Sequence, residues 1–200
     1  MSNMYWLIGI LLVTTSASTI NTANADSNAG LLLTDFTAES TDMGWFVVND
    51  NVMGGRSDGE FEQADGLLDF TGRTNTNGGG FSSIRTQPME LALPDHSGVQ
   101  LRVKGDGRRY MWRLTTDARW RGRQVGYWAE FPTEDGVWTT VNLPWSNFRP
   151  QYRGYRLDGP ALDPAQITGM GLMIYDGLDG PFALQLESVS AYSASSAPRE

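Results

Sequence analysis

The sequence predicts an all-β fold, an antiparallel β-sandwich or jelly roll, and three observations point to it. Apolar and polar residues alternate with a period of two along several segments, as in strands that bury one face. Glycine-rich clusters separate these segments, and such clusters form the tight turns of antiparallel sheets. No long segment has the apolar spacing of an amphipathic helix. A chain of 200 residues with 40% hydrophobic side chains fits one domain.

Four segments carry the alternation most clearly, and we expect each to form a half-buried strand. Their apolar phases are Val99, Leu101 and Val103; Tyr110, Trp112 and Leu114; Thr139, Val141 and Leu143; and Phe182, Leu184 and Leu186. The turn clusters are residues 54–55, 64–66, 77–80, 105–107, 135–136 and 176–177. This spacing predicts about nine or ten short strands.

One helical turn is predicted near the C-terminal end of the chain. Asp163 is a suitable N-cap and Pro164 suits the first helical position, so the turn runs to about Ile167. The rest of the chain between the turns is expected to be strand.

The N-terminal residues have the pattern of a secretory signal peptide. The apolar run 5–13 is followed by small polar residues and by Ala23-Asn24-Ala25, an A-x-A cleavage pattern. We therefore expect a leader over residues 1–25, one jelly-roll domain over 26–192, a disordered tail over 193–200, and a periplasmic or secreted protein with no stable membrane insertion after cleavage. An uncleaved membrane anchor is the alternative, although the apolar run is short for a spanning helix.

Composition excludes several kinds of chemistry. The chain has no cysteine and one histidine, His96, which rules out a disulfide framework, a cysteine-ligated metal, a thiol nucleophile and multi-histidine metal sites. The net charge of −8 opposes the phosphate backbone of nucleic acids. We predict no metal, no cofactor and no nucleic-acid partner.

One motif suggests a serine hydrolase, but its surroundings do not fit. Residues 55–59 match G-x-S-x-G, and His96 lies downstream. A nucleophile elbow requires a strand, a sharp turn and a helix, whereas the motif leads into strand-like sequence and the chain lacks alternating strands and helices. We therefore predict that the protein is not an enzyme.

Several ordered motifs resemble those of one known family. They are residues 45–57 (WFVVNDNVMGGRS), 77–85 (NGGGFSSIR), 105–110 (GDGRRY), 131–133, 138, 143–148 (LPWSNF), 153–154 and 180–182. The sequence resembles the complex I intermediate-associated protein 30 family over about residues 31–192. The resemblance implies a galactose-binding-like jelly roll, and it implies an assembly factor or chaperone, since relatives in mitochondria act in the assembly of respiratory complex I.

Charged and aromatic residues beside the shared turns are the candidate binding residues. Guanidinium and carboxylate groups placed there either form an internal network of salt bridges or line a polar cleft, and both alternatives remain open. Two tryptophans on the polar phase of their strands could stack on sugars or pack against a partner. The candidates are Asp50, Arg56, Arg85, Asp106, Arg109, Trp128 and Trp138.

Two functions remain. The first is a non-enzymatic exported module that holds a protein client in the cell envelope, and the resemblance makes a subunit of a respiratory complex one candidate client. The alternative is a secreted carbohydrate-binding module, which the jelly roll, the aromatic residues and the export signal would also suit.

Overall fold

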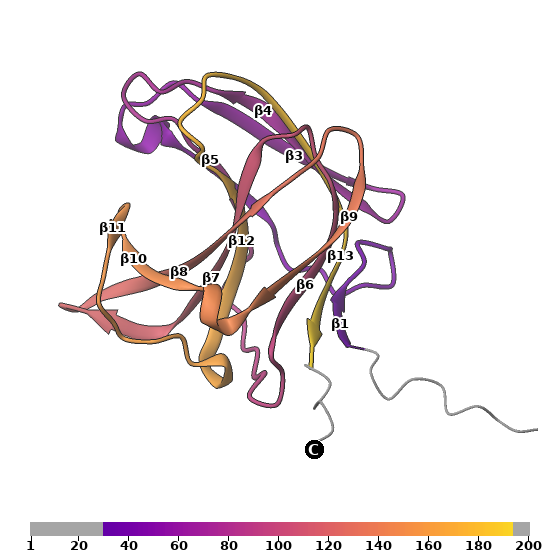
Figure 1. The fold of residues 1–200 in the computed structure, drawn as a ribbon, viewed down its shortest axis with the longest axis vertical. Helices are drawn as coiled ribbons and strands as arrows, with labels where there is room; N and C mark the ends of the chain where they lie inside the picture. Colours follow the sequence, from indigo (N-terminus) through magenta and orange to yellow (C-terminus); the bar gives the residue numbers. More distant parts are fainter. Residues whose placement is uncertain (1–29, 194–200) are drawn as a thin grey trace, which may run out of the picture.

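The computed structural model describes residues 30–193, which form two antiparallel sheets packed face to face (Figure 1). One sheet has the order β3-β4-β13-β6-β9, and β1 also pairs with β13. Its strands are β1 (Leu31–Thr34), β3 (Asp58–Ala64), β4 (Leu67–Thr74), β6 (Gly98–Lys104), β9 (Trp138–Pro144) and β13 (Gly180–Tyr192). The predicted all-β sandwich is confirmed.

The second sheet has seven strands in the order β11-β10-β8-β7-β12-β5-β2. They are β2 (Phe46–Asn49), β5 (Ser82–Arg85), β7 (Arg109–Trp120), β8 (Arg123–Pro132), β10 (Arg149–Tyr152), β11 (Tyr155–Arg156) and β12 (Ile167–Ile174). The described residues thus hold thirteen strands, more than expected. Five of them have four residues or fewer, and such short segments carry too little alternation to be recognised from sequence.

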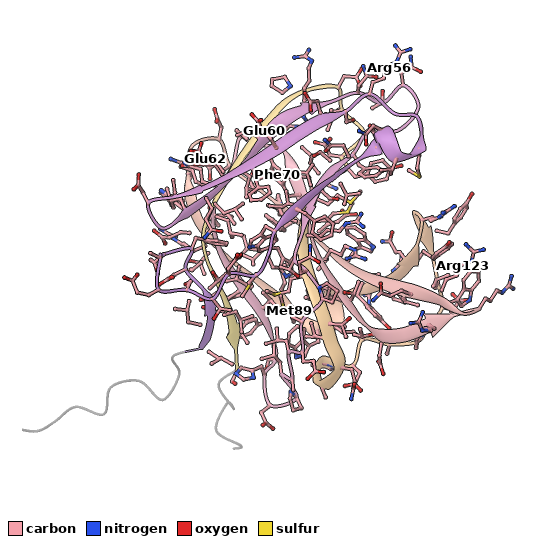
Figure 2. All side chains as sticks on the ribbon, turned by 180° about the vertical axis from the view of Figure 1, so that it is seen from behind. Arg56, Glu60, Glu62, Phe70, Met89 and Arg123 are labelled. Atoms are coloured by element: carbon pink, nitrogen blue, oxygen red, sulfur yellow. The ribbon has the colours of Figure 1, made fainter. Side chains whose placement is uncertain are left out.

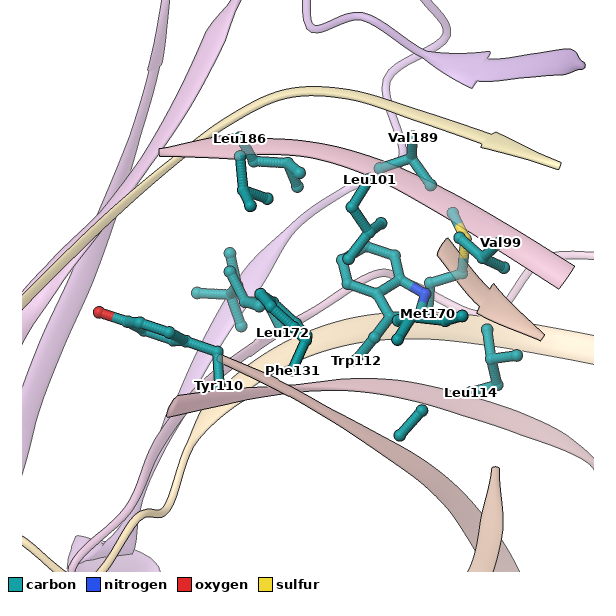
Figure 3. Close-up of a cluster of buried hydrophobic side chains, with 14 of the residues drawn as sticks. Val99, Leu101, Tyr110, Trp112, Leu114, Phe131, Met170, Leu172, Leu186 and Val189 are labelled. Atoms are coloured by element: carbon teal, nitrogen blue, oxygen red, sulfur yellow. The ribbon is translucent and has the colours of Figure 1, made fainter. Parts of the chain in front are cut away.

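The core lies between the sheets and contains the apolar phases that the sequence indicated. Val99, Leu101, Tyr110, Trp112 and Leu114 are fully buried. Figure 3 shows side chains from β6 and β7, Leu101 and Trp112 among them, meeting in the space between the sheets. In β6, β7 and β13 the alternation therefore gives one apolar face and leaves the other face free for polar groups.

Three short 3-10 helices interrupt the strands: η1 (Asp50–Met53), η2 (Trp145–Asn147) and η3 (Pro164–Gln166). The predicted helical turn is η3, in which the Asp163 carboxylate accepts a hydrogen bond of 3.0 Å from the amide of Ala165 and Pro164 occupies the first position. Ile167 begins β12, so both ends of the predicted turn are confirmed.

The predicted leader and nearly all of the predicted tail lie outside the described residues, and both stay predictions. Within residues 30–193, no helix is long and apolar enough to cross a bilayer.

Candidate functional site

The seven-stranded sheet presents one curved face away from the core. In Figure 1 this sheet bends so that the β10–β11 hairpin and the η1 segment, at its two ends, turn toward the same side. Directly paired residues of antiparallel strands point to the same face of a sheet. Strand register therefore places one row of outward side chains across β10, β8, β7, β12, β5 and β2: Arg149, Trp128, Arg113, Gly171, Arg85 and Phe46.

A groove of about 470 Å³ follows this row. Val52 and Met53 of η1 form one end, and Tyr152 and Arg153 form the other. The remaining lining residues are Val48, Phe81, Arg85, Met111, Arg113, Gln124, Gly126, Trp128, Gln151, Gly154, Met173 and Tyr175. Of the seven residues proposed from sequence, the groove brings together two, Arg85 and Trp128.

Arg113 is the central cation of the groove. Its guanidinium lies over the Trp128 ring, 5.4 Å from the ring centroid. It makes no hydrogen bond or ion pair with any other side chain or backbone group in residues 30–193. Burial, and then the nearby charge of Arg85, lowers the pKa of Arg113 to about 9. The residues that line the groove include three arginines, Arg85, Arg113 and Arg153, and no Asp or Glu.

Arg85 is equally short of partners. Its Nε atom is buried and has no acceptor within the described part of the chain, and burial lowers its pKa. A buried cation usually has a carboxylate or several carbonyls around it, because loss of hydration is otherwise uncompensated. Arg85 and Arg113 depart together from that rule.

Glycines form the floor beneath these side chains. A Cβ atom at Gly171 would lie 3.3 Å from Cγ of Arg85, and one at Gly126 would lie 3.1 Å from the Trp128 indole nitrogen and 3.5 Å from Nε of Arg113. The two arginines and the indole therefore lie low over bare backbone, where a larger residue would lift them.

Two methionines lie in the next row of the same face, between Glu130 of β8 and Ser83 of β5. Register pairs Met111 of β7 with Met173 of β12, and Met53 and Tyr175 stand exposed at the margin. Thioether side chains are flexible and polarizable, and they adapt to apolar groups of varied shape. The groove thus combines two unpaired cations with an adaptable apolar strip.

A second cavity of about 500 Å³ adjoins the groove and shares Met111 and Tyr175 with it. Its polar groups are already paired, since Arg108 donates to both Asp176 oxygens, at 2.9 Å from Nε and 2.6 Å from Nη2. Arg108 also donates to Thr74 and to the carbonyls of Leu178, Gly180 and Pro181. This closed network fastens the β12–β13 loop to β7.

Asp50 has a structural position and forms no ion pair with an arginine within residues 30–193. Its side chain is fully buried and accepts hydrogen bonds from the Ser57 hydroxyl and from the amides of Ser57, Gly80 and Phe81. A Cβ at Gly55 or Gly79 would come within 2.6 Å of the carboxylate. The glycine-rich motifs 54–56 and 77–80 therefore fold around Asp50 as a cage of backbone groups.

Of the two alternatives that the sequence left open, an internal salt-bridge network would need ion pairs among Asp50, Arg56, Arg85, Asp106 and Arg109, and the described residues contain none. Asp106 accepts from the Arg108 and Ala183 amides and from the Tyr110 hydroxyl. Arg109 is 64% exposed and lies 3.6 Å from Glu130. Arg56 is exposed, and Figure 2 shows it at the periphery of the molecule. Backbone amides and the hydroxyls of Ser57 and Tyr110 satisfy the two aspartates instead.

Trp138 lies on the other sheet, in β9. Arg102 and Lys104 of β6 lie over its ring at 5.7 Å and 5.3 Å from the centroid, so it does not join Trp128. Sequence reasoning missed Arg113, Met111 and Met173 as site residues. Arg113 and Met111 occupy the outward phase of β7, whose other phase is buried. Met173 belongs to β12, which is buried along nearly its whole length, so no alternation marks it.

Comparison with known proteins gives the family. Residues 34–186 match the family model described as complex I intermediate-associated protein 30. The chain belongs to this family. An uncharacterized protein of Schizosaccharomyces pombe is 29% identical to this family member over 169 residues, which are 72% of this chain and 76% of the yeast protein.

A mouse protein of the family, complex I intermediate-associated protein 30, mitochondrial, is 32% identical over 100 residues, 48% of this chain. The chain spans 30% of the mouse protein's length. Among the solved structures similar to this member of the complex I intermediate-associated protein 30 family is the family 11 carbohydrate-binding module of a Clostridium thermocellum cellulosomal cellulase. It has a TM-score of 0.61 at 14% identity, covering 84% of this chain and 97% of the module.

The family 11 module of Clostridium thermocellum in complex with a β-1,3-1,4-mixed-linked tetrasaccharide is similar too, with a TM-score of 0.60 at 14% identity, over 82% of this chain and 96% of the module. At this level of identity the likeness establishes the fold, and ligands do not follow from it. Among the described residues, no group of three or more metal-binding side chains is gathered.

Proposed function

We propose that this chain is a non-enzymatic binding module that holds a protein client in the groove of the seven-stranded sheet. The observation that carries the proposal is the composition of that face: Met53, Met111 and Met173 beside Arg85 and Arg113. Arginine and aromatic residues are the common energetic anchors of protein interfaces, and methionines suit surfaces that accept varied apolar side chains.

The proposed place of action is the cell envelope, reached by export through the leader predicted over residues 1–25. The family relation supports an assembly role, since the mouse relative is named as a complex I intermediate-associated protein. We therefore infer that the client is a folding or assembling envelope protein, with subunits of respiratory complexes as the first to be examined.

A photo-crosslinking amino acid placed in the groove would test client binding in cells. Met53 and Tyr175 are suitable positions because they are exposed at the groove margin, by 59% and 46%. Thr140, exposed on β9 of the opposite sheet, is the matched control. The same defined protein should be captured from both groove positions and not from Thr140, and mass spectrometry would identify it. Capture from all three positions alike would contradict the proposal.

A secreted carbohydrate-binding module is the second candidate, because Trp128 and Tyr152 present two rings along the groove. Both rings are already occupied by guanidinium groups, Trp128 by Arg113 and Tyr152 by Arg123 and Arg153, which leaves less ring surface for stacking on a sugar. A glycan array separates the candidates. A specific glycan ligand that is lost on Trp128→Ala, with no crosslinked protein, would favour the carbohydrate module.

A further inference from the structure

We propose that Arg85 and Arg113 form a carboxylate-binding pair, which receives an Asp or Glu side chain from an extended segment of the client. This inference rests on the proposed function and deepens it, because it names the chemical group that the groove recognises. Neither residue has a carboxylate partner within residues 30–193.

Arg108 differs from Arg85 and Arg113 in the groove, because its guanidinium has hydrogen-bond acceptors within the chain. Arg108, in the turn before β7, is held by Asp176 and by the backbone carbonyls of Leu178, Gly180 and Pro181. The chain thus surrounds one partly buried arginine with acceptors and leaves two others, a short way along the sheet, with none. A ligand that supplies the missing negative charge would complete the pattern.

The geometry suits a carboxylate. Arg85 and Arg113 belong to one transverse row and stand on either side of Gly171, so their side chains rise from strands two positions apart in the sheet. A guanidinium offers a planar set of donors that matches the two oxygens of a carboxylate. The Trp128 ring lies against one face of the Arg113 guanidinium. This contact orders the side chain beforehand, so less conformational entropy is lost when the ligand binds.

The row that contains Met111 and Met173 predicts which residue type lies near the acidic residue of the client segment. Met111 and Met173 lie two residues along their strands from Arg113 and Gly171, a separation of about 7 Å. An extended client segment has the same repeat between alternate side chains. An acidic residue at the arginine pair would therefore place an apolar residue, two positions away, over the methionines.

The overall charge of the chain limits the chemical class of ligand that the groove can bind. The chain carries a net charge of −8, so a polyanion would be repelled by most of its surface. The groove is locally cationic, because Arg153 also lines it and Arg149 continues the row. One carboxylate among apolar residues fits this local charge.

Selection from a displayed library of random peptides of about a dozen residues, using the full chain as bait, tests the proposal. The selected peptides should share one Asp or Glu with an apolar residue two positions away. Replacing that acid by its amide in the synthetic peptide should weaken binding at least tenfold, about 1.4 kcal/mol. The same weakening is expected for Arg85→Gln and Arg113→Gln, and a smaller one for Arg113→Lys.

Arg102→Gln is the matched control, because Arg102 also lies over a tryptophan ring but on the opposite sheet and beside Glu187. It should leave peptide affinity unchanged. Peptides that bind in the groove without an acidic preference would overturn the carboxylate pair and leave client binding intact. A failure to select any peptide, together with binding of a uronate-bearing glycan, would overturn both proposals.

Thermal melting separates ligand binding from a structural role. Arg113→Met removes a charge that has no partner, so its melting temperature should equal or exceed that of the unchanged chain. Arg108→Met leaves Asp176 buried and unpaired, so its melting temperature should fall. A fall of equal size for Arg113→Met would contradict the absence of a structural partner and overturn the proposal.

Discussion

Asp50 shows how one carboxylate can organise two distant loops. It sits at the start of η1 and accepts four hydrogen bonds from residues 57, 80 and 81. Burial raises the pKa of this carboxyl, but the Ser57 hydroxyl and the Gly80, Ser57 and Phe81 amides together bring its pKa below the ordinary value. The ionised form therefore stabilises the loop that carries Val52 and Met53 to the groove.

Asp50→Ala should destabilise the fold by about 3 kcal/mol, because the Ser57 hydroxyl and the amides of Ser57, Gly80 and Phe81 lose this buried acceptor. Urea unfolding of both proteins measures the difference. Asp58→Ala, at an exposed position on β3, is the control and should cost little. Equal, small losses for the two variants would show that the carboxylate cage contributes nothing to stability.

Sequence reasoning at the residue scale could not choose the partner of a charge. Pairing of Asp50 and Asp106 with arginines was one of two alternatives, and amides and hydroxyls satisfy both carboxylates. Arg108, one position before the candidate Arg109, makes the bidentate pair with Asp176. Such a choice depends on a loop 68 residues away in the chain, and no local pattern reports it.

Strands were more predictable than sites, because their signal is local. The alternation in β6, β7 and β13 identified buried residues such as Val103, Leu114 and Leu184. The outward phase gives no comparable information. Arg102 and Arg113 read alike in sequence, yet they lie on opposite sheets, and only the pairing of β7 with β12 and β5 brings Arg113 near Arg85.

The flat stretch of β8 beneath Trp128 depends on Gly126. A methyl group there would lie 3.1 Å from the Trp128 indole nitrogen, a tight contact that shifts the ring on which the Arg113 guanidinium rests, and 3.5 Å from Nε of Arg113, an ordinary contact. Gly126→Ala should therefore weaken binding of a selected acidic peptide several-fold and change the melting temperature little, since both neighbours are ends of flexible side chains.

Isothermal titration calorimetry with that peptide measures the effect of Gly126→Ala. Gly159→Ala serves as its control, because an added Cβ there meets nothing within 4 Å. Unchanged affinity in Gly126→Ala would mean that the position of Arg113 over the glycine is unimportant for binding.

On the scale of the whole molecule, hydrogen-bonded and ion-paired side chains lie on both sides of the groove. The Asp50 cage holds the loops at one end of the seven-stranded sheet, and the Arg108–Asp176 pair, with side chains 11% and 6% exposed, holds the β12–β13 loop. The groove lies between these fixed parts. A rigid frame around unpaired cations is what a preformed binding site requires.

Acid should unfold the protein through these same carboxylates. Burial raises the pKa of Asp176, whereas hydrogen bonds from Arg108 and the Leu178 amide outweigh it, so the pKa lies below its usual value, as it does for Asp50. Groups with a lowered folded-state pKa stabilise the fold above their unfolded pKa of about 4, and this contribution is lost as the pH falls through the folded value.

Urea midpoints from pH 7 to pH 2.5 should therefore stay level down to about pH 5 and then decline. The Asp50→Ala variant should show a shallower decline, because one of the protonations linked to unfolding is removed. Stability that rises on acidification would contradict these pKa directions.

The most direct test of the account is an NMR titration that follows the arginine Nε–Hε resonances of the full chain with a selected acidic peptide. The resonances of Arg85 and Arg113 should shift together and saturate at one dissociation constant, while those of Arg102 and Arg108 stay in place. Shifts confined to Arg102 and the Trp138 side of the molecule, with Arg85 and Arg113 unmoved, would contradict the assignment of the groove as the binding site.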